Sequence, residues 1–279
     1  MIAVDLHVSK NRIIKTLGLS KGTLYYQTKG YPASRRSKLT RDPEAVQAIR
    51  TICKGEPTYG SPRVKAILER DHGIELTKYM TTSIMREEGL LIERAKSPRA
   101  SREHTGRIAV SDPNTRWASD ITSIKCWDGT KIRVAIVMDC CDRSIIGWKI
   151  GRTMQASDIE LLLQEALLKR FGGDVPDGKG LEFLHDNGPE YIERVFQSSL
   201  KGWNVVDCRT PTYSPQSNGM CESFNWTFKR DYVYQSCLDD YETVEKQIGR
   251  WFRKYNLYAP HSSLGMMSPQ KYYEERMAS

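Results

Sequence analysis

The order of strand-like and helix-like segments between residues 113 and 209 constrains the fold more than any other feature of this 279-residue chain. Runs rich in β-branched, aromatic and other apolar residues predict strands over 116–124, 131–139, 145–150, 181–186 and 204–208. Helical spacing of apolar residues predicts helices over 157–171 and 190–201, and Asp128-Gly129 predicts a hairpin turn between the first two strands. Strands followed by alternating helices and strands predict a mixed α/β sheet covered by helices.

A further helix is predicted over 218–230, because this segment opens with the turn pair Asn218-Gly219 and then continues without Pro or Gly. Glu222 and Lys229 are seven residues apart, nearly two helical turns, so they lie on one face of the helix. The same face carries Asn218, Asn225 and Trp226. A solvated helix surface would explain this stripe by itself, and we expect Trp226 to pack in the core rather than stack on a base.

Three acidic residues fall at positions that could meet in such a fold. Asp120 lies in the first predicted strand, Asp186 at the end of the fourth, and Glu222 early in the helix over 218–230. Carboxylates on neighbouring strands and a facing helix could bind two magnesium ions about 3.5–4 Å apart, which would activate one oxygen of a phosphodiester reaction and stabilise the leaving one. Because Asp and Glu are common residues, three acids alone prove little.

Positive charge is concentrated in the first part of the chain. Residues 1–110 contain 21 Lys and Arg against 11 Asp and Glu, whereas the remainder holds 21 basic and 23 acidic residues. The excess behind the net charge of +8 is therefore N-terminal, which favours a nucleic-acid-binding region over a charge that only aids solubility. Five cations between residues 94 and 107, Lys96 and Arg99 among them, form a linker that we expect also to follow DNA phosphates.

Two helical units are predicted in this basic region. Residues 8–28 follow the helix, short glycine-containing turn and helix order of a helix-turn-helix, although any small helical hairpin has the same layout. Helical spacing recurs over 43–95, where Arg63 and Lys65 lie near a helix N-terminus with Ser61 as its expected cap. Backbone N–H groups at such an end favour phosphate, so both cations are predicted DNA contacts.

Nothing in the sequence predicts export or membrane insertion. No apolar run is long enough to cross a bilayer, and the first residues lack the basic and apolar regions of a signal peptide. The seven cysteines include no Cys-x-x-Cys pair, which favours free thiols over a disulfide framework or a zinc ribbon. We therefore expect a cytoplasmic protein.

The short sequence motifs around the three acids resemble those of a known family. They read Trp117-Ala-Ser-Asp120-Ile-Thr, His185-Asp186-Asn-Gly-Pro-Glu-Tyr and Ser217-Asn-Gly-Met-Cys-Glu222-Ser-Phe. The chain is similar to DDE transposases of the retroviral-integrase superfamily, and specifically to the integrase-like product of insertion-sequence-three-family bacterial elements. Thirty-five residues separate Asp186 from Glu222, which is the family's spacing, and Lys229 is the basic residue expected seven beyond the glutamate.

The resemblance extends beyond the motifs that contain the three acids. Tyr59-Gly-Ser-Pro-Arg-Val is similar to the family's second helical DNA-binding module, and the segment from Tyr255 to Tyr273 is similar to its C-terminal box. The chain departs from the family pattern at Cys221, where Ala is usual, and at Ala259, where Arg is usual. The sequence lacks the His-His-Cys-Cys spacing of the retroviral zinc domain, which argues against a retroviral integrase proper.

The resemblance implies a ribonuclease H-like core with a three-carboxylate site. Asp120 would bridge two Mg²⁺ ions, for which Mn²⁺ can substitute, while Asp186 and Glu222 would each complete one metal site. The implied reaction is a metal-dependent cleavage that frees a 3′ hydroxyl, followed by attack of that hydroxyl on another phosphodiester. The chain would thereby integrate an insertion sequence into target DNA.

Double-stranded DNA, as the element's terminal inverted repeats and as target, is the partner that the resemblance implies. Asn218, Asn225 and Lys229 would hold the terminal DNA, and the pairing of two ends implies at least a dimer. The host would be bacterial and the protein associated with the nucleoid. Two other functions stay open, a non-catalytic DNA-binding regulator of transposition and a metal-dependent nuclease of the same fold.

These features together predict the domain organisation. The predicted parts are a possible helix-turn-helix (1–30), a basic linker (31–42), a helical DNA-binding module (43–95), a second basic linker (96–112), a ribonuclease H-like DDE catalytic core (113–235) and a C-terminal helical extension (236–279). Asp139, at the end of the second strand, either orients the site or caps the Cys140-Cys141 turn. His185 and His261 are expected to be structural.

Overall fold

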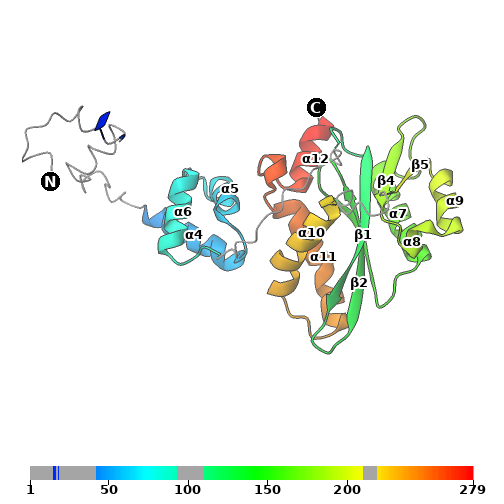
Figure 1. Ribbon diagram of the computed structural model, residues 1–279, viewed down its shortest axis with the longest axis horizontal. Helices are drawn as coiled ribbons and strands as arrows, with labels where there is room; N and C mark the ends of the chain where they lie inside the picture. Colours follow the sequence, from blue (N-terminus) through cyan, green and yellow to red (C-terminus); the bar gives the residue numbers. More distant parts are fainter. Residues whose placement is uncertain (1–14, 17, 19–41, 93–109, 210–218, 279) are drawn as a thin grey trace, which may run out of the picture. The chain divides into compact units, whose positions relative to one another are not determined.

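The computed structural model describes residues 15, 16, 18, 42–92, 110–209 and 219–278 (Figure 1). Three of the predicted DNA contacts, Lys96, Arg99 and Asn218, lie outside the described residues, as does nearly all of the helix-turn-helix predicted over 8–28. Within the described ranges, no helix combines the length and apolarity that crossing a membrane requires.

Between residues 42 and 92 the structure has three helices: α4 (Pro43–Gly55), α5 (Ser61–His72) and α6 (Lys78–Glu87). The structure corrects the start of α5, whose N-cap is Gly60, in extended backbone, rather than Ser61. Ser61 is already helical and buried, and its hydroxyl accepts a hydrogen bond from Thr82 Oγ1 of α6 at 2.8 Å. The hydroxyl therefore joins two helices instead of capping one. Gly73, with φ of 66°, ends α5 in the left-handed conformation that glycine adopts without strain.

A five-stranded sheet with the strand order β3-β2-β1-β4-β5 forms the larger part of the structure. Its strands are β1 (Arg116–Lys125), β2 (Lys131–Asp139), β3 (Ile145–Gly151), β4 (Leu181–His185) and β5 (Val205–Arg209). The first three strands are antiparallel neighbours, joined by the predicted hairpin, whereas β4 pairs parallel with β1 and β5 parallel with β4. This confirms the predicted mixed sheet.

Helices make the crossovers that parallel strands require. α7 (Ala156–Phe171) leads to β4, and α8 (Pro189–Ile192) and α9 (Arg194–Gly202) lead to β5. The single helix predicted over 190–201 is therefore two helices, separated at Glu193, whose backbone is extended. Tyr191 and Phe196 are both buried in the same cluster of side chains. On one continuous helix, residues five apart would point about 140° from each other, so the break allows both rings to face the sheet.

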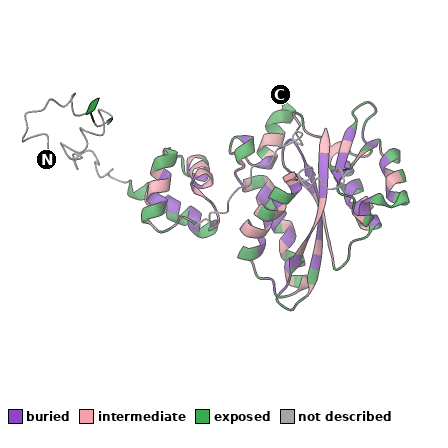
Figure 2. Ribbon diagram, in the orientation of Figure 1, coloured by how far each residue is buried: buried purple, intermediate pink, exposed green. Residues whose placement is uncertain are grey.

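Successive residues of β1 and β2 face opposite sides of the sheet, and each side has its own apolar core (Figure 2). Trp117 and Val137 pack toward α7 and α9, while Ala118 and Ile136 pack toward α10 (Gly219–Asp231) and α11 (Tyr241–Tyr258). Figure 1 shows these helices on the two sides of the sheet. The shorter elements η3 (Val233–Gln235), η4 (Ser262–Leu264) and α12 (Pro269–Ala278) complete the described chain.

Stacked aromatic rings fix α10 against α11. The ring of Phe228 lies parallel to that of Phe252, with centroids 4.8 Å apart, and Phe224 stacks on Phe228 at 5.6 Å. Each such pair contributes about 0.5–1.5 kcal/mol beyond the burial of its apolar area. The position of α10 beside the sheet, and with it the position of Glu222, therefore rests on a rigid apolar contact.

Candidate active site

Asp120 lies in the middle of β1, beyond the residues of that strand that pair with β4. Asn225 of α10 donates a hydrogen bond from Nδ2 to Asp120 Oδ2 at 2.6 Å. Burial raises the pKa of the Asp120 carboxyl above its ordinary value, and the charges of Asp186 and Glu222 raise it further, whereas the hydrogen bond from Asn225 acts in the opposite direction. The fold thus brings the three predicted acids into electrostatic contact.

Asp186 directly follows β4, in the turn that leads into α8. Its Oδ1 accepts a hydrogen bond from the backbone N–H of Gly188 at 2.9 Å, so the side chain stabilises its own turn. A Cβ atom at Gly188 would lie only 3.0 Å from that oxygen and from a carboxylate oxygen of Glu190. Glycine therefore keeps the space beside the carboxylate open.

Glu222 lies in the first turn of α10 and is exposed. Phe224 and Phe228 bury one side of the helix against the sheet and α11. The polar stripe of Glu222, Asn225 and Lys229 follows the opposite side, as helical spacing predicts. The carboxylate is consequently held by a well-packed helix while its own oxygens remain accessible.

The oxygen donors at this site are the kind that hard divalent cations prefer. Besides the three carboxylates, Asn225 Oδ1 is buried and has no hydrogen-bond partner in the described part of the chain, which leaves one acceptor beside Asp120 for a ligand. Nowhere in the described part are three or more His, Cys, Asp or Glu side chains close enough together to hold a metal ion. Repulsion among three like charges favours this spacing as long as no cation offsets it. The donor chemistry fits the cation, and the spacing in this structure is wider than a closed metal site.

The residue before each aspartate is anchored in a buried layer of polar contacts. Ser119 shares a hydrogen bond with the hydroxyl of Tyr191, with the two oxygens 2.8 Å apart. The ring of Tyr191 stacks on that of His185, with centroids 4.7 Å apart. One ring nitrogen of His185 lies 2.6 Å from the backbone carbonyl oxygen of Asp186, and the other lies 2.7 Å from Asp207 Oδ1. His185 is therefore structural, as predicted, and it supports the backbone of the second aspartate.

Tyr191 and Asp207 had no role in the sequence interpretation. Their contacts with Ser119 and His185 join segments that are 72 and 22 residues apart in the chain. Repeating patterns within one helix or strand cannot predict contacts between residues so far apart in the chain. The only available signal was that Ser119 and His185 directly precede the two aspartates.

Arg63 and Lys65, two of the predicted DNA contacts, both have acidic partners within the chain. Arg63 Nη1 lies 2.6 Å from Asp231 Oδ2, and its guanidinium carbon lies 3.9 Å from the centroid of the Tyr59 ring. Lys65 forms an ion pair with Glu69 one helical turn away. Their contact with DNA stays a prediction, and for Arg63 it would compete with a buried carboxylate.

Lys229 and Trp226 both lie on α10, and the structure shows the surroundings of each. Lys229 is half-buried, and no acidic side chain in the described part lies within ion-pair distance of it. The prediction that Trp226 packs in the core is wrong, because its side chain is 65% exposed and lies under the guanidinium of Arg230 at 4.5 Å. The apolar side of α10 is occupied by Phe224 and Phe228, which leaves Trp226 on the polar side.

Asp139 caps the turn after β2, which settles the alternative left open by the sequence. Its Oδ1 accepts the backbone N–H groups of Cys141 at 2.7 Å and Asp142 at 3.2 Å, and its Oδ2 accepts that of Asn114 at 2.7 Å. Burial raises the pKa of Asp139 to about 6, and the charge of Asp142 contributes in the same direction. This carboxylate therefore has a structural role.

Family models and a relative of known name match most of this chain. An integrase core domain model matches residues 110–215, a second integrase core domain model matches 208–269, and an HTH-like domain model matches 40–99. Transposase InsD for insertion element IS2A/D/F/H/I/K of Escherichia coli is 33% identical over 273 residues, which cover 95% of this chain and 90% of that relative. The chain belongs to the insertion-sequence-three family of DDE transposases. The resemblance inferred from the acidic words is thereby confirmed.

Solved structures with some likeness to this transposase include viral integrases. A chain of a simian T-cell lymphotropic virus intasome in complex with PP2A regulatory subunit B56 gamma has a TM-score of 0.49 and 15% identity, over 75% of this chain and 74% of that one. The HTLV-2 integrase catalytic core domain in complex with magnesium has a TM-score of 0.46 and 16% identity, over 58% of this chain and 97% of that one. The family assignment rests on the sequence relative and on the integrase core models.

Proposed function

We propose that this transposase cleaves the strand ends of an insertion sequence and joins the freed 3′ hydroxyl to another phosphodiester. The observation that carries the proposal is that Asp186, at the end of β4, and Glu222, on α10, lie near enough to Asp120 of β1 for their charges to raise its pKa. A carboxylate whose pKa is raised by burial and by two further carboxylates is a candidate for a functional site. Family membership supports the same chemistry.

The three carboxylates would hold Mg²⁺ or Mn²⁺, and the bound ions would polarise the phosphate oxygens and favour the ionised form of the attacking hydroxyl. Asn225 orients Asp120 through its 2.6 Å hydrogen bond and leaves its own Oδ1 for a ligand. Lys229, which has no acidic partner in the described part of the chain, would offset phosphate charge on the same helix face.

Two successive transfers at phosphorus account for the proposed reaction. In the first, a water oxygen forms a bond to phosphorus and the bond to the 3′ oxygen breaks, which leaves a 3′ hydroxyl. In the second, that hydroxyl oxygen attacks another phosphodiester, whose own 3′ oxygen leaves. One phosphodiester forms for each that breaks in this step, so it needs neither an external energy source nor a covalent protein intermediate.

DNA recognition is proposed for the basic, helical N-terminal part. The excess of positive charge lies in residues 1–110, and the HTH-like model matches 40–99. Lys96 and Arg99, in the basic linker, would follow phosphates, and Asn218 would contact the terminal DNA next to the α10 face. Because two element ends must meet, we also propose at least two copies of the chain on DNA, which sedimentation with and without paired ends would test.

Incubation of the full chain with labelled element ends and Mg²⁺ tests the function. Cleaved ends together with joined products are expected. Cleavage without joining would favour a nuclease, and DNA binding without any cleavage would favour a regulator. The predicted terminal repeats would be supplied from the DNA that flanks the coding sequence, with a scrambled duplex as the control for sequence recognition.

Variants of the three acids test the site. Asp186→Asn and Glu222→Gln should each lower the rate of cleavage by about a thousandfold. Folding and DNA binding should stay nearly unchanged, because both side chains are exposed. Glu165→Gln is the matched control, since Glu165 is an exposed helical glutamate of α7 on the other side of the sheet. Joining by Asp186→Asn at the unsubstituted rate would refute the site assignment.

A further inference from the structure

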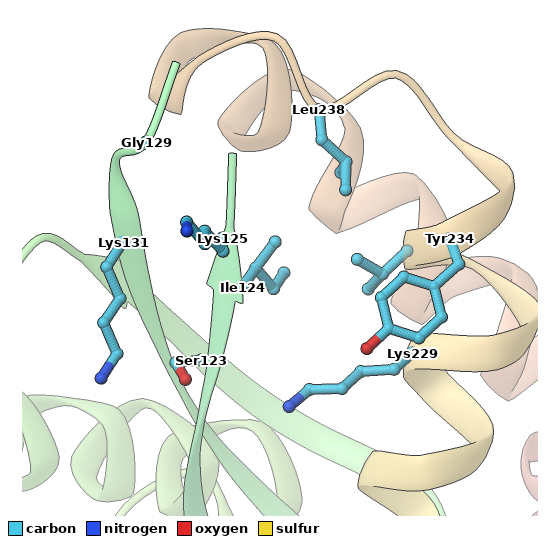
Figure 3. A pocket seen from close by; sticks show the side chains of 9 residues that line it. Ser123, Ile124, Lys125, Gly129, Lys131, Lys229, Tyr234 and Leu238 are labelled. Carbon is cyan, nitrogen blue, oxygen red and sulfur yellow. The ribbon is translucent and has the colours of Figure 1, made fainter. Parts of the chain in front are cut away.

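A pocket of about 530 Å³ lies next to the candidate active site, between the β1–β2 hairpin and the segment formed by α10, η3 and the residues after it (Figure 3). Its volume falls within the range of about 300–1,000 Å³ that is usual for small-ligand sites. Ser123 and Lys125 line it from β1, and Lys229 and Tyr234 line it from the opposite side. None of the functions assigned above requires a pocket at this position.

The hairpin side of the pocket carries uncompensated positive charge. Lys125 and Lys131 are direct cross-strand partners, an arrangement in which like charges destabilise a hairpin. No acidic side chain of the described part forms an ion pair with either lysine or with Lys229. Asp128, in the hairpin turn, is already engaged, because its carboxylate accepts the backbone N–H and the hydroxyl of Thr130. Three cations thus line one pocket, and none of them has an acidic ion-pair partner within the described ranges.

The opposite wall is apolar and aromatic. Ile124, Val233 and Leu238 line the pocket with buried side chains, whereas the ring of Tyr234 is 68% exposed. Figure 3 shows the Tyr234 ring and Lys229 on one side of the pocket and the hairpin side chains on the other. A flat ligand could therefore place one face on Tyr234 and direct a charged group to the lysines.

Backbone hydrogen bonds hold the two walls together. The N–H of Trp127 bonds the carbonyl oxygen of Leu238 at 2.8 Å, and the N–H of Asp128 bonds that of Asp239 at 3.2 Å. The hairpin tip is thereby tied to the segment that follows η3. The pocket exists before a ligand arrives, so binding does not have to order its walls.

Two residues that line the pocket lie on the same elements as two of the candidate catalytic acids. Ser123 lies three residues beyond Asp120 on β1, and Lys229 lies seven residues beyond Glu222 on α10. A DNA strand that places one phosphate at the carboxylates could therefore place a neighbouring nucleotide in the pocket.

We infer that this pocket binds one unpaired nucleotide of the DNA strand engaged at the active site. The phosphate would contact the lysines, and the base would stack on Tyr234 above the apolar wall. A base inside a duplex is stacked on both faces and cannot reach that ring, so the nucleotide must be unpaired. An acidic peptide would match the charge but would leave the exposed aromatic ring unused. The inference rests on the proposed function and adds a binding site to it.

Fluorescence anisotropy with the full chain and no divalent metal tests the pocket apart from catalysis. Three labelled duplexes are compared: one blunt, and two that carry three unpaired thymidines at the 5′ or at the 3′ end. Taking the ratio of overhang to blunt affinity cancels the contributions of other DNA-binding surfaces. Base stacking on an aromatic side chain corresponds to a gain of between about fivefold and about a hundredfold, so a ratio near ten is expected for one overhang.

Substitutions test which residues produce the higher affinity for the overhang duplex. Tyr234→Ala should reduce the ratio to near one, Tyr234→Phe should preserve it, and Lys131→Gln should lower it severalfold. Lys246→Gln is the matched control, because Lys246 is an exposed lysine of α11 outside the pocket. Since Tyr234 is mostly exposed, its loss should leave the melting temperature unchanged.

Each contrary result has a separate meaning. Equal affinity for blunt and overhang duplexes, or a ratio that survives Tyr234→Ala, would overturn the pocket while leaving the proposed function intact. Failure to bind any duplex would contradict both. Thymidine 5′-monophosphate is the probe for a free nucleotide, and its displacement of the overhang at micromolar concentration would overturn the assignment to a DNA strand.

Discussion

The hydrogen bond between Ser119 and Tyr191 gives the sharpest test of how the site is supported. Ser119 is 0% exposed and Tyr191 is 1% exposed, and their hydroxyl oxygens lie 2.8 Å apart. Ser119→Ala or Tyr191→Phe removes one partner, changes little volume, and leaves the other hydroxyl buried without a partner. Each single substitution should therefore lower the free energy of unfolding by about 1–3 kcal/mol.

The double variant separates this explanation from a general loss of packing. When both hydroxyls are removed, no buried polar group is left unsatisfied, so the double variant should be close to the unsubstituted chain. The coupling free energy between the two sites is then the sum of the two single losses, about 2–6 kcal/mol, with a sign that shows one substitution relieving the other.

Urea unfolding at neutral pH, followed by tryptophan fluorescence, measures these free energies, with midpoints compared at constant slope. Tyr234→Phe is the matched control, because it removes an exposed hydroxyl and should change stability by less than about 0.5 kcal/mol. If the loss in the double variant equals the sum of the single losses, the hydrogen bond does not hold the two elements together and the reasoning is refuted.

Two further predictions concern stability. Burial, with the charges of Arg143 and Arg63, lowers the pKa of His261 from 6.5 to about 4, so its contribution to stability is present above pH 6.5 and is lost as pH falls toward 4. By pH 5 this loss amounts to about 2 kcal/mol, which His261→Gln should remove from the pH dependence of the urea midpoint; an unchanged dependence would contradict it. Asp139→Ala leaves three buried N–H groups without acceptors and should lower the free energy of unfolding at pH 7 by about 3 kcal/mol or more, whereas the exposed Glu222→Gln should cost less than about 0.5 kcal/mol. Equal midpoints for these last two variants would refute the structural role of Asp139.

Local patterns were sufficient to predict the strands and most of the helices. The period of 3.6 residues depends only on which side of a helix is buried, and α10 shows it in its buried residues Cys221, Phe224 and Phe228. The errors arose where contacts between elements decided the outcome. The break at Glu193 lets Tyr191 and Phe196 reach one cluster, and Ser61 bonds Thr82 of another helix instead of capping its own.

The candidate site shows the same division. Asp120, Asp186 and Glu222 were predicted from the resemblance of the motifs around them to those of the family, and carboxylates are suitable ligands for the metal ions that assist phosphodiester transfer. Their electrostatic contact is a property of the folded sheet and helix. The prediction that Trp226 packs in the core was wrong because Phe224 and Phe228 occupy the apolar side of the same helix. The spacing of residues along the helix does not show which of its aromatic side chains are buried.

The sequence by itself was enough to predict the family and most of the elements and to single out three candidate acids, because each prediction depends on a short run of neighbouring residues. Only the tertiary structure decided that Lys125 faces Lys131 across from Tyr234, that Arg63 is held by Asp231, and that Asp139 caps a turn. These pairings join residues that meet only after the strands register and the helices pack. Close packing and the need to satisfy buried polar groups select such contacts, and neither acts along a single segment of chain.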